Sequence, residues 1–401
     1  MQTKKPKLPQ YNFVNENNVF KFLLIFGAMV LFTMNILIPH GQQHFVQLAQ
    51  AFIQGKLYFL STAKHLNDSV MFQGQFYWPL GPLPAIILIP FVIIWGDKIQ
   101  QGYIQFFAIA LVFFLLFKIA KKITGDQEKS LWLSFGYIFS TAFVGIALRP
   151  WSWQFGQIIA NVFIIYALYE YLHKRSWLFI GICIGLAMGA RFHLLIATMF
   201  FALSILFTPT TKKKKLINLF KLIFPIITSL IMLLIYNYLR FHNFFEQGYS
   251  FQHLDNPLLL INRQHGLWSL AHVPVNIYYF LIKSPEGIFI PNTQVLQFPY
   301  IKASPWGLSI LFTSPMFLWL IKAQWKNKDV LFAALTTCLL AFVIFGYYGI
   351  GWRQYGYRYA VDFYPFLFLI LAFAVRQGRS LLFKIIIIFS YFFNLYLVFH
   401  Y

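Results

Sequence analysis

Long apolar runs, separated by short polar segments, fill the chain from residue 21 almost to the C-terminus. Most approach the roughly 20 residues that an α-helix needs to cross a membrane. Lipid cannot satisfy backbone N–H and C=O groups, so such runs are expected to be helices. The pattern predicts about eleven membrane spans, at residues 20–38, 100–118, 130–148, 155–172, 177–190, 194–208, 216–236, 305–321, 329–346, 363–376 and 381–398.

Residues 83–95 form an apolar stretch that is shorter than a full span and contains Pro90. We expect a re-entrant or interfacial helix there, at the outer face of the membrane. An earlier segment has apolar residues at helical spacing, which predicts an amphipathic helix on the membrane surface: Phe45, Leu48, Ala49, Phe52 and Ile53. Between these two helices the chain is expected to turn at residues 73–75.

Composition and charge agree with one all-α integral membrane domain covering residues 1–401, because 59% of the residues are hydrophobic and 11% charged. The 32 Lys and Arg exceed the 11 Asp and Glu, but the basic residues cluster in short loops between spans. This is the positive-inside pattern, which places the N-terminus in the cytoplasm and the C-terminus outside. A nucleic-acid partner is disfavoured, because no soluble basic domain carries the charge.

This topology leaves two large outer segments, residues 39–99 and 237–304, and two short outer loops at 149–154 and 347–362. All four are rich in aromatic and polar residues. We expect the two large segments to form the active-site face. Because transmembrane charges are rare and functional, the few charged residues next to these segments are the candidates for chemistry.

Asp68 is the carboxylate that lies deep in the first outer segment. A carboxylate held at the boundary of lipid and water can accept a proton from a hydroxyl group. Asp68 can equally be an ordinary polar loop residue.

Arg191 lies between two apolar runs, near the outer face, after Gly189 and Ala190. A guanidinium suits phosphate oxygens, and the small neighbours leave room for a bulky anion. The alternative is a topological anchor that reaches the interface.

Three charged residues, Arg353, Arg358 and Asp362, lie among aromatic residues in the last outer loop. Asp362 follows Arg358 by four residues, so in a helix the two can simply pair. Arg353 has no carboxylate at such a spacing and is the better candidate for binding phosphate.

The second large outer segment contains a group of polar residues with irregular spacing: Arg240, His242, Glu246, Tyr249, His253 and His265. Zinc sites have characteristic ligand spacings, which these histidines do not follow. We therefore predict substrate contact here rather than metal ligation, with Glu246 as a candidate.

The chain resembles the polytopic GT-C glycosyltransferases, in particular the bacterial branch of aminoarabinose and mannosyl transferases that use polyprenyl-phosphate sugars. The motifs that carry this resemblance are "HFVQLAQAFIQGKLYF", "GQFYWPLGPLPAIILIPFVIIWG", "GICIGLAMGARFHLLIATMFF", "NYLRFHNFFEQGY", "SPWGLSILFTSP" and "GYRYAVDFYPFL". They are degenerate, but together they extend over nearly the whole chain. The resemblance implies an enzyme of the bacterial plasma membrane with a lipid-linked donor and no nucleotide cofactor.

The resemblance also implies roles for individual residues. Asp68 matches the family's base in the first outer segment, Arg191 its phosphate-binding cation, and Arg358 with Tyr359 its "RY" pair near the end. Many relatives carry an acidic pair after the first span, where this chain has Gln43 and His44. His44 can share the acid-base role. A divalent metal can assist a phosphate leaving group, so the resemblance leaves room for one.

The function expected from these observations is transfer of a sugar from a polyprenyl phosphate to a glycan or lipid acceptor outside the membrane. Two alternatives stay open, a transporter or flippase of lipid-linked sugars and a polysaccharide polymerase or ligase. Transporters usually have repeated halves and charges near the middle of the membrane. In this sequence the charges lie at the ends of apolar runs and no half-repeat is visible, which favours the enzyme.

Overall fold

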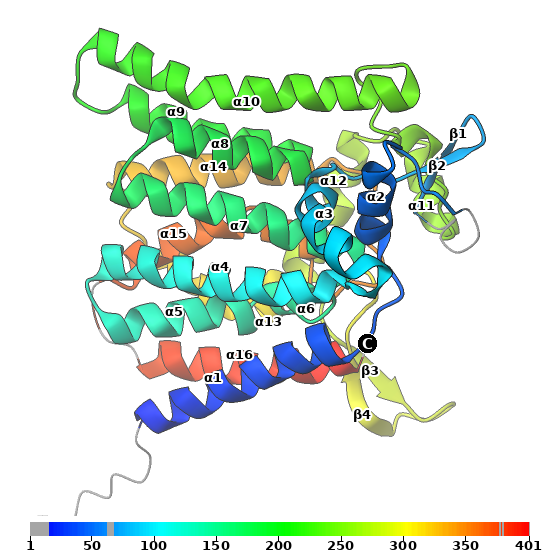
Figure 1. Cartoon of the computed structure of the whole chain (residues 1–401). Helices are drawn as coiled ribbons and strands as arrows, with labels where there is room; N and C mark the ends of the chain where they lie inside the picture. Colours follow the sequence, from blue (N-terminus) through cyan, green and yellow to red (C-terminus); the bar gives the residue numbers. More distant parts are fainter. Residues whose placement is uncertain (1–15, 62–67, 377, 379–380, 401) are drawn as a thin grey trace, which may run out of the picture.

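The computed structural model describes residues 16–61, 68–376, 378 and 381–400. Its helices lie side by side in a bundle whose long axes run across Figure 1. The main helices of this bundle are α1 (Glu16–Phe32), α4 (Gln101–Thr124), α5 (Gln127–Phe139), α7 (Ser152–His173), α8 (Trp177–Ala190), α9 (Thr198–Leu206), α10 (Lys212–Phe241), α14 (Lys328–Phe345), α15 (Tyr364–Ala374) and α16 (Leu381–Phe399).

Six helical segments in the described part of the chain are long and apolar enough to cross a membrane: Asn18–Leu37, Gln101–Thr124, Ser152–His173, Lys212–Phe241, Lys328–Phe345 and Leu381–Phe399. Shorter apolar helices occupy three further predicted spans, at Trp177–Ala190, Phe192–Leu206 and Tyr364–Ala374. The chain is therefore a polytopic helical membrane protein, as predicted. The predicted number of eleven spans is not established.

Two of the predicted spans are broken. Residues 130–148 are divided between α5 and the short α6 (Phe143–Ala147). Residues 305–321 contain only α13 (Ile310–Thr313) and the 3₁₀ helix η7 (Pro315–Lys322). Proline disfavours a helical conformation in the residue before it, and Ser314 accordingly leaves the helix with φ −142° and ψ 46°.

The bundle has a centre and a rim. In the most apolar window of α7, 78% of the residues are buried, whereas in α10 the share is 17%. The apolar side chains of α10 are thus free to face lipid, while α7 is enclosed by its neighbours. Polar side chains in the first half of α7, such as Gln157 and Asn161, are therefore buried and need partners within the protein.

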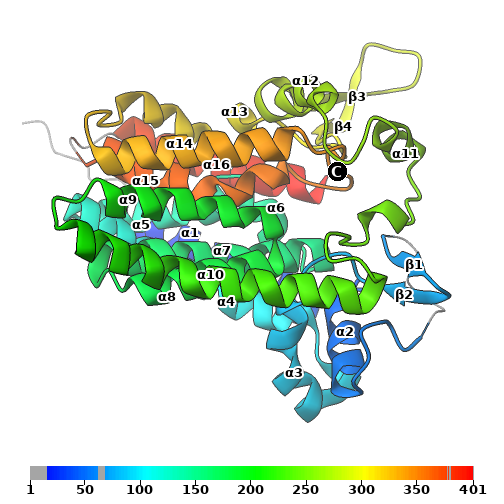
Figure 2. The same ribbon diagram turned by 90° about the horizontal axis from the view of Figure 1, so that it is seen from above.

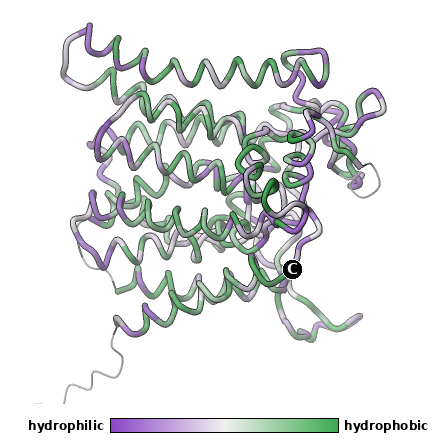
Figure 3. Tube along the Cα trace, viewed as in Figure 1, coloured by the Kyte–Doolittle hydropathy of each residue, from purple (hydrophilic) through white to green (hydrophobic). Residues whose placement is uncertain are grey.

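The two ends of the bundle differ, as the hydropathy colouring in Figure 3 and the positions of the short elements in Figures 1 and 2 show. One end, called the basic end below, carries the lysines at the start of α10 and the end of α4. The other end, called the loop end below, carries α2 (His44–Ile53), α3 (Leu83–Trp95), α11 (Pro257–Arg263), α12 (Val273–Ile277), and the hairpins β1 (Val70–Phe72) with β2 (Gln75–Tyr77) and β3 (Glu286–Phe289) with β4 (Leu296–Lys302).

Both short helices predicted in the first outer segment are present. α3 has the predicted bounds and contains Pro90, and α2 packs against it beside the loop end of the bundle (Figures 1 and 2). The buried face of α2 departs in detail from the predicted one, since Val46 and Ala51 are buried and Ile53 is exposed.

The predicted turn at residues 73–75 is the tip of the β1–β2 hairpin. Gln73 and Gly74 both have positive φ, 49° and 76°. A two-residue hairpin loop favours this conformation because its twist matches that of the strands. The two hairpins themselves were not predicted, because strands of three to seven residues leave little trace in a hydropathy pattern dominated by membrane helices.

Candidate active site

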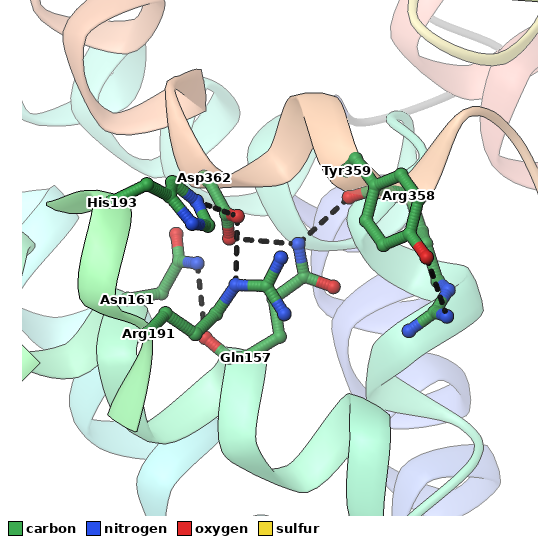
Figure 4. Close-up of polar contacts among 7 residues, drawn as sticks. All are labelled: Gln157, Asn161, Arg191, His193, Arg358, Tyr359 and Asp362. Atoms are coloured by element: carbon green, nitrogen blue, oxygen red, sulfur yellow. Dashed lines mark hydrogen bonds and ion pairs between the residues drawn. The ribbon is translucent and has the colours of Figure 1, made fainter. Parts of the chain in front are cut away.

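A buried polar cluster links Gln157 of α7, Arg191 after the end of α8 and Asp362 before the start of α15 (Figure 4). Asp362 is its centre, with a side chain that is 0% exposed. Its Oδ2 atom accepts hydrogen bonds from Arg191 Nε at 2.7 Å and contacts His193 Nε2 at 2.7 Å. Its Oδ1 atom accepts from Gln157 Nε2 at 2.8 Å. A buried carboxylate is stable only with such partners, so this cluster holds Arg191 in one orientation.

The predicted pair between Arg358 and Asp362 does not form. Both residues lie in the 3₁₀ helix η8 (Arg358–Asp362), in which residues four apart do not share a face as they do in an α-helix. Asp362 instead pairs with Arg191, which is 171 positions away in the sequence. Arg358 stacks on Tyr359, with its Cζ atom 4.8 Å from the ring centroid.

Gly189 serves close packing next to Arg191. A Cβ atom on Gly81 would lie 2.1 Å from the carbonyl oxygen of Gly189, so the segment before α3 and the end of α8 touch backbone to backbone. A Cβ atom on Gly189 would lie 3.3 Å from Cβ of Leu83, so the start of α3 occupies the space beside position 189 where the sequence suggested room for an anion.

Asp68 is fixed at the loop end by the second large outer segment. Its backbone N–H donates to the carbonyl oxygen of His253 at 3.1 Å, and its carbonyl oxygen accepts from Gln252 Nε2 at 3.2 Å. Its side-chain Oδ2 accepts a hydrogen bond from Trp153 Nε1 at 3.1 Å. Two segments that are distant from Asp68 in the sequence, at Trp153 and at Gln252 and His253, therefore hold this carboxylate in place.

The environment of Asp68 changes its acidity. Burial raises the pKa of its carboxyl group, because a charged form loses hydration. The hydrogen bond from Trp153 and the charges of Arg358 and Arg353 oppose this rise, but the pKa stays above its ordinary value. A raised pKa makes the carboxylate a stronger base when it is ionised.

An apolar cavity of about 270 Å³ lies between α8, α10 and α14. Its walls include Leu80, Met188, Leu233, Leu267, Val343 and Ile344. Arg191, His193 and Arg240 also line it, and no carboxylate does so among the described residues. Arg240 is 2% exposed and donates to Trp78 O at 2.8 Å and to Asn237 Oδ1 at 2.9 Å. The cavity thus combines an apolar interior with two cations.

A second, polar cavity of about 130 Å³ lies at the loop end. Asp68, Asp255, Arg353 and Arg358 line it together with aromatic and amide side chains. Every residue of its lining belongs to one of the four segments 39–99, 149–154, 237–304 and 347–362. Segments that are separated by membrane helices in the sequence therefore build one cavity.

The two cavities share a wall. Trp153, Tyr347 and Tyr359 line both of them, and Arg191 lies over the Tyr359 ring, 5.8 Å from its centroid. Arg191 and Asp68 thus lie in neighbouring cavities on either side of three aromatic side chains.

The other candidate residues lie elsewhere. His44 is 4% exposed, stacks on Trp78 at 4.1 Å between ring centroids, and contacts Ser152 Oγ through Nδ1 at 3.0 Å. Glu246 accepts a hydrogen bond from the backbone N–H of Gly248. Among the described residues, the linings of the two cavities include neither His44 nor Glu246.

The residues of the polar cavity do not resemble a metal site. Within the described ranges, no three His, Cys, Asp or Glu side chains gather as metal ligands. The two carboxylates of the polar cavity face two guanidinium groups in the same lining. A divalent cation has too few oxygen ligands of this kind to replace its hydration shell.

Sequence reasoning missed several residues of the site, among them His193, Gln157 and Trp153. His193 follows Arg191 by two positions, and a second polar residue there was a usable signal. Gln157 lies in an apolar run, where a buried amide needs a partner. Trp153 was indistinguishable from the tryptophans that anchor membrane helices at the interface.

No protein-family model matches the chain, and no curated protein sequence does so. Several solved structures are similar to it, among them the following two. ArnT from Cupriavidus metallidurans in the apo state has a TM-score of 0.51 and 8% identity, over 91% of this chain and 60% of that chain. The oligosaccharyltransferase of Archaeoglobus fulgidus in the apo form has a TM-score of 0.50 and 11% identity, over 95% and 55%.

At these identities the likeness concerns the fold, and the chain spans little more than half the length of either protein. This chain therefore shares the fold of ArnT and of the oligosaccharyltransferase, and this is the fold expected from the sequence motifs.

Proposed function

We propose that the protein is a membrane glycosyltransferase that transfers a sugar from a polyprenyl-phosphate donor to an acceptor on the outer face of the membrane. The observation that carries the proposal is the meeting of two unlike cavities at Trp153, Tyr347 and Tyr359. One is apolar and lined by arginines, and the other is polar and contains a basic carboxylate. The names of the two structures that share the fold agree with an enzyme of this class.

The apolar cavity suits the lipid phosphate of the donor. Its walls match a hydrocarbon chain, and it lies between helices of a membrane bundle. Only the Nε atom of Arg191 is used by Asp362, and among the described residues its terminal nitrogens form no other hydrogen bond. They can donate to phosphate oxygens, as guanidinium groups commonly do. Arg240 adds a second positive charge to the lining.

The polar cavity suits the acceptor. Asp68 in its ionised form takes the proton from an acceptor hydroxyl group while the hydroxyl oxygen forms a bond to the anomeric carbon of the sugar. The bond between that carbon and the phosphate oxygen breaks, and its electron pair leaves with the polyprenyl phosphate. Arg191 stabilises the charge that develops on the phosphate. Attack from the side opposite the leaving group inverts the configuration of the sugar.

A flippase of lipid-linked sugars is the second candidate. It also needs an apolar path with cations, but it has no use for a carboxylate with a raised pKa beside that path. Asp68, held by Trp153 and two backbone contacts, favours chemistry over transport. A polysaccharide polymerase or ligase differs from the leading proposal only in its acceptor.

The test is transfer from a radiolabelled polyprenyl-phosphate sugar by the full chain in lipid nanodiscs, supplied with cell-envelope material as acceptor. Asp68→Asn should lower the transfer rate by a factor on the order of 10²–10⁴, the usual contribution of a general base. Asp97→Asn is the matched control, because Asp97 is an exposed carboxylate of the same segment. Movement of the labelled lipid across vesicles without any transfer would instead establish the flippase.

A further inference from the structure

Arg358 is a buried cation without a carboxylate partner among the described residues. It is 6% exposed, and its Nε and Nη1 atoms are buried without any hydrogen-bond partner. Its Nη2 atom lies 3.5 Å from the hydroxyl group of Tyr359, which is a weak interaction. A buried guanidinium in this condition is costly, so an anion that enters the polar cavity can recover much of that cost.

The acid in the same cavity does not satisfy this cation. No nitrogen of Arg358 lies within ion-pair distance of Asp68. Asp255, the other carboxylate of the lining, is 62% exposed and contacts His253 at 3.3 Å. Solvent screens a pair of this kind. One half-buried acid and one buried guanidinium therefore line the same cavity without forming an ion pair.

The two residues are fixed by different parts of the chain. The backbone of Asp68 is tied to His253 and Gln252 in the second large outer segment, and its side chain accepts a hydrogen bond from Trp153. The carbonyl oxygen of Arg358 accepts from Gln157 Nε2 of α7 at 2.8 Å. The two side chains thus lie at separate places in the lining, where each is available for a different group of one ligand.

The rest of the lining indicates what kind of ligand this is. The lining contains aromatic and amide side chains, among them Trp151, Trp153, Trp352, Tyr347, Gln154 and Gln252. The Oε1 atom of Gln154 is buried without a hydrogen-bond partner among the described residues. Flat apolar surfaces with a few oriented polar groups suit a sugar ring, which has apolar faces and a polar rim.

We infer that the acceptor is an anionic glycan, with its reacting hydroxyl group at Asp68 and a phosphate or carboxylate substituent at Arg358. This inference rests on the proposed function, because it takes the polar cavity to be the acceptor site. The lipid phosphate of the donor is a different anion with its own cavity, where Arg191 and Arg240 are available.

The inference can be tested by isothermal titration calorimetry on the full chain in nanodiscs with small probes. Glucose 6-phosphate should bind the unaltered protein at least about tenfold more tightly than glucose, since a charge-assisted hydrogen bond is worth this much. Arg358→Gln should abolish this difference, and Arg358→Lys, which keeps the charge, should retain part of it. Arg175→Gln, an exposed arginine at the basic end, should change nothing.

Farnesyl phosphate, a lipid phosphate, distinguishes the donor's anion from the acceptor's anion. The affinity of the protein for farnesyl phosphate should stay the same in Arg358→Gln and fall in Arg191→Gln. Equal binding of glucose and glucose 6-phosphate by the unaltered protein, or a loss of farnesyl phosphate in place of glucose 6-phosphate in Arg358→Gln, would overturn the inference. Failure of Arg191→Gln to weaken farnesyl phosphate would contradict the proposed function and leave the result for Arg358 standing.

Discussion

The two cavities differ most in how their arginines are balanced. In the apolar cavity Arg191 is paired with Asp362, whose side chain is fully buried behind it, and the described lining contains no carboxylate. In the polar cavity Asp68 and Arg358 carry opposite charges, yet they do not pair. A paired arginine is held in position to bind a ligand that always arrives in the same orientation. An acid and an arginine that do not pair with each other can each bind a different part of one ligand.

The largest expected effect comes from removing the carboxylate that holds Arg191. Asp362→Ala leaves Arg191 and His193 without their fully buried partner, which should lower the free energy of unfolding by about 3–5 kcal/mol. Thermal unfolding in detergent measures this. Asp329→Ala is the comparison, because Asp329 accepts a hydrogen bond from Tyr171 at the partly buried basic end. Equal losses of unfolding free energy in the two variants would mean that the cluster around Asp362 contributes no more to stability than an ordinary side-chain hydrogen bond.

The second prediction separates binding from turnover. Arg191→Gln should weaken polyprenyl-phosphate binding by about tenfold to a hundredfold, since it removes charge-assisted hydrogen bonds. Asp68→Asn should leave that binding nearly unchanged. Fluorescence titration of the tryptophans in the two linings measures both. If Asp68→Asn weakens lipid binding as much as Arg191→Gln does, the assignment of the donor to the apolar cavity and of the acceptor to the polar cavity is wrong.

The third prediction concerns the pH dependence of transfer. Asp68 must be ionised to act as a base, so activity should be lost as the pH falls through its raised pKa. Trp153→Phe removes a hydrogen bond that lowers this pKa, and the acidic limb of the pH–rate profile should therefore move to higher pH.

The control for the pH prediction is Trp352→Phe. Trp352 lines the same cavity and contacts Trp306, with a distance of 4.5 Å between ring centroids and an angle of 53° between the rings. Its replacement changes the lining but removes no hydrogen bond to Asp68 in the described part of the chain. An unchanged acidic limb in Trp153→Phe would show that this carboxylate does not govern the profile.

Much of the helical architecture could be predicted from the sequence, because membrane helices must be long and apolar. The bounds of α3 and the turn at Gln73 could also be predicted, because each depends on residues that are neighbours in the sequence. The pairing of charges could not be predicted. Sequence spacing suggested an ion pair between Arg358 and Asp362. These residues lie in a 3₁₀ helix, and Asp362 pairs instead with Arg191, which is 171 positions away in the sequence. Local pattern determines a helix, whereas a buried charge selects its partner from the whole fold.

The roles of the candidate residues were harder still. The sequence placed Asp68, Arg191 and Arg358 near one face, but it contained no sign that Trp153, Tyr347 and Tyr359 divide that face into two cavities. His44 resembled a catalytic residue in the sequence and is enclosed between Trp78 and Ser152 in the structure. The difference lies in side-chain packing, which no hydropathy pattern records.

The most direct measurement is an experimental structure of the protein in nanodiscs with a bound polyprenyl phosphate. The account predicts that the phosphate lies within hydrogen-bonding distance of Arg191, that the lipid chain follows the apolar cavity between α8, α10 and α14, and that the polar cavity stays free for the acceptor. A polyprenyl phosphate whose phosphate group is bound at Arg358 in the polar cavity, or whose lipid chain lies outside the apolar cavity, would contradict the account.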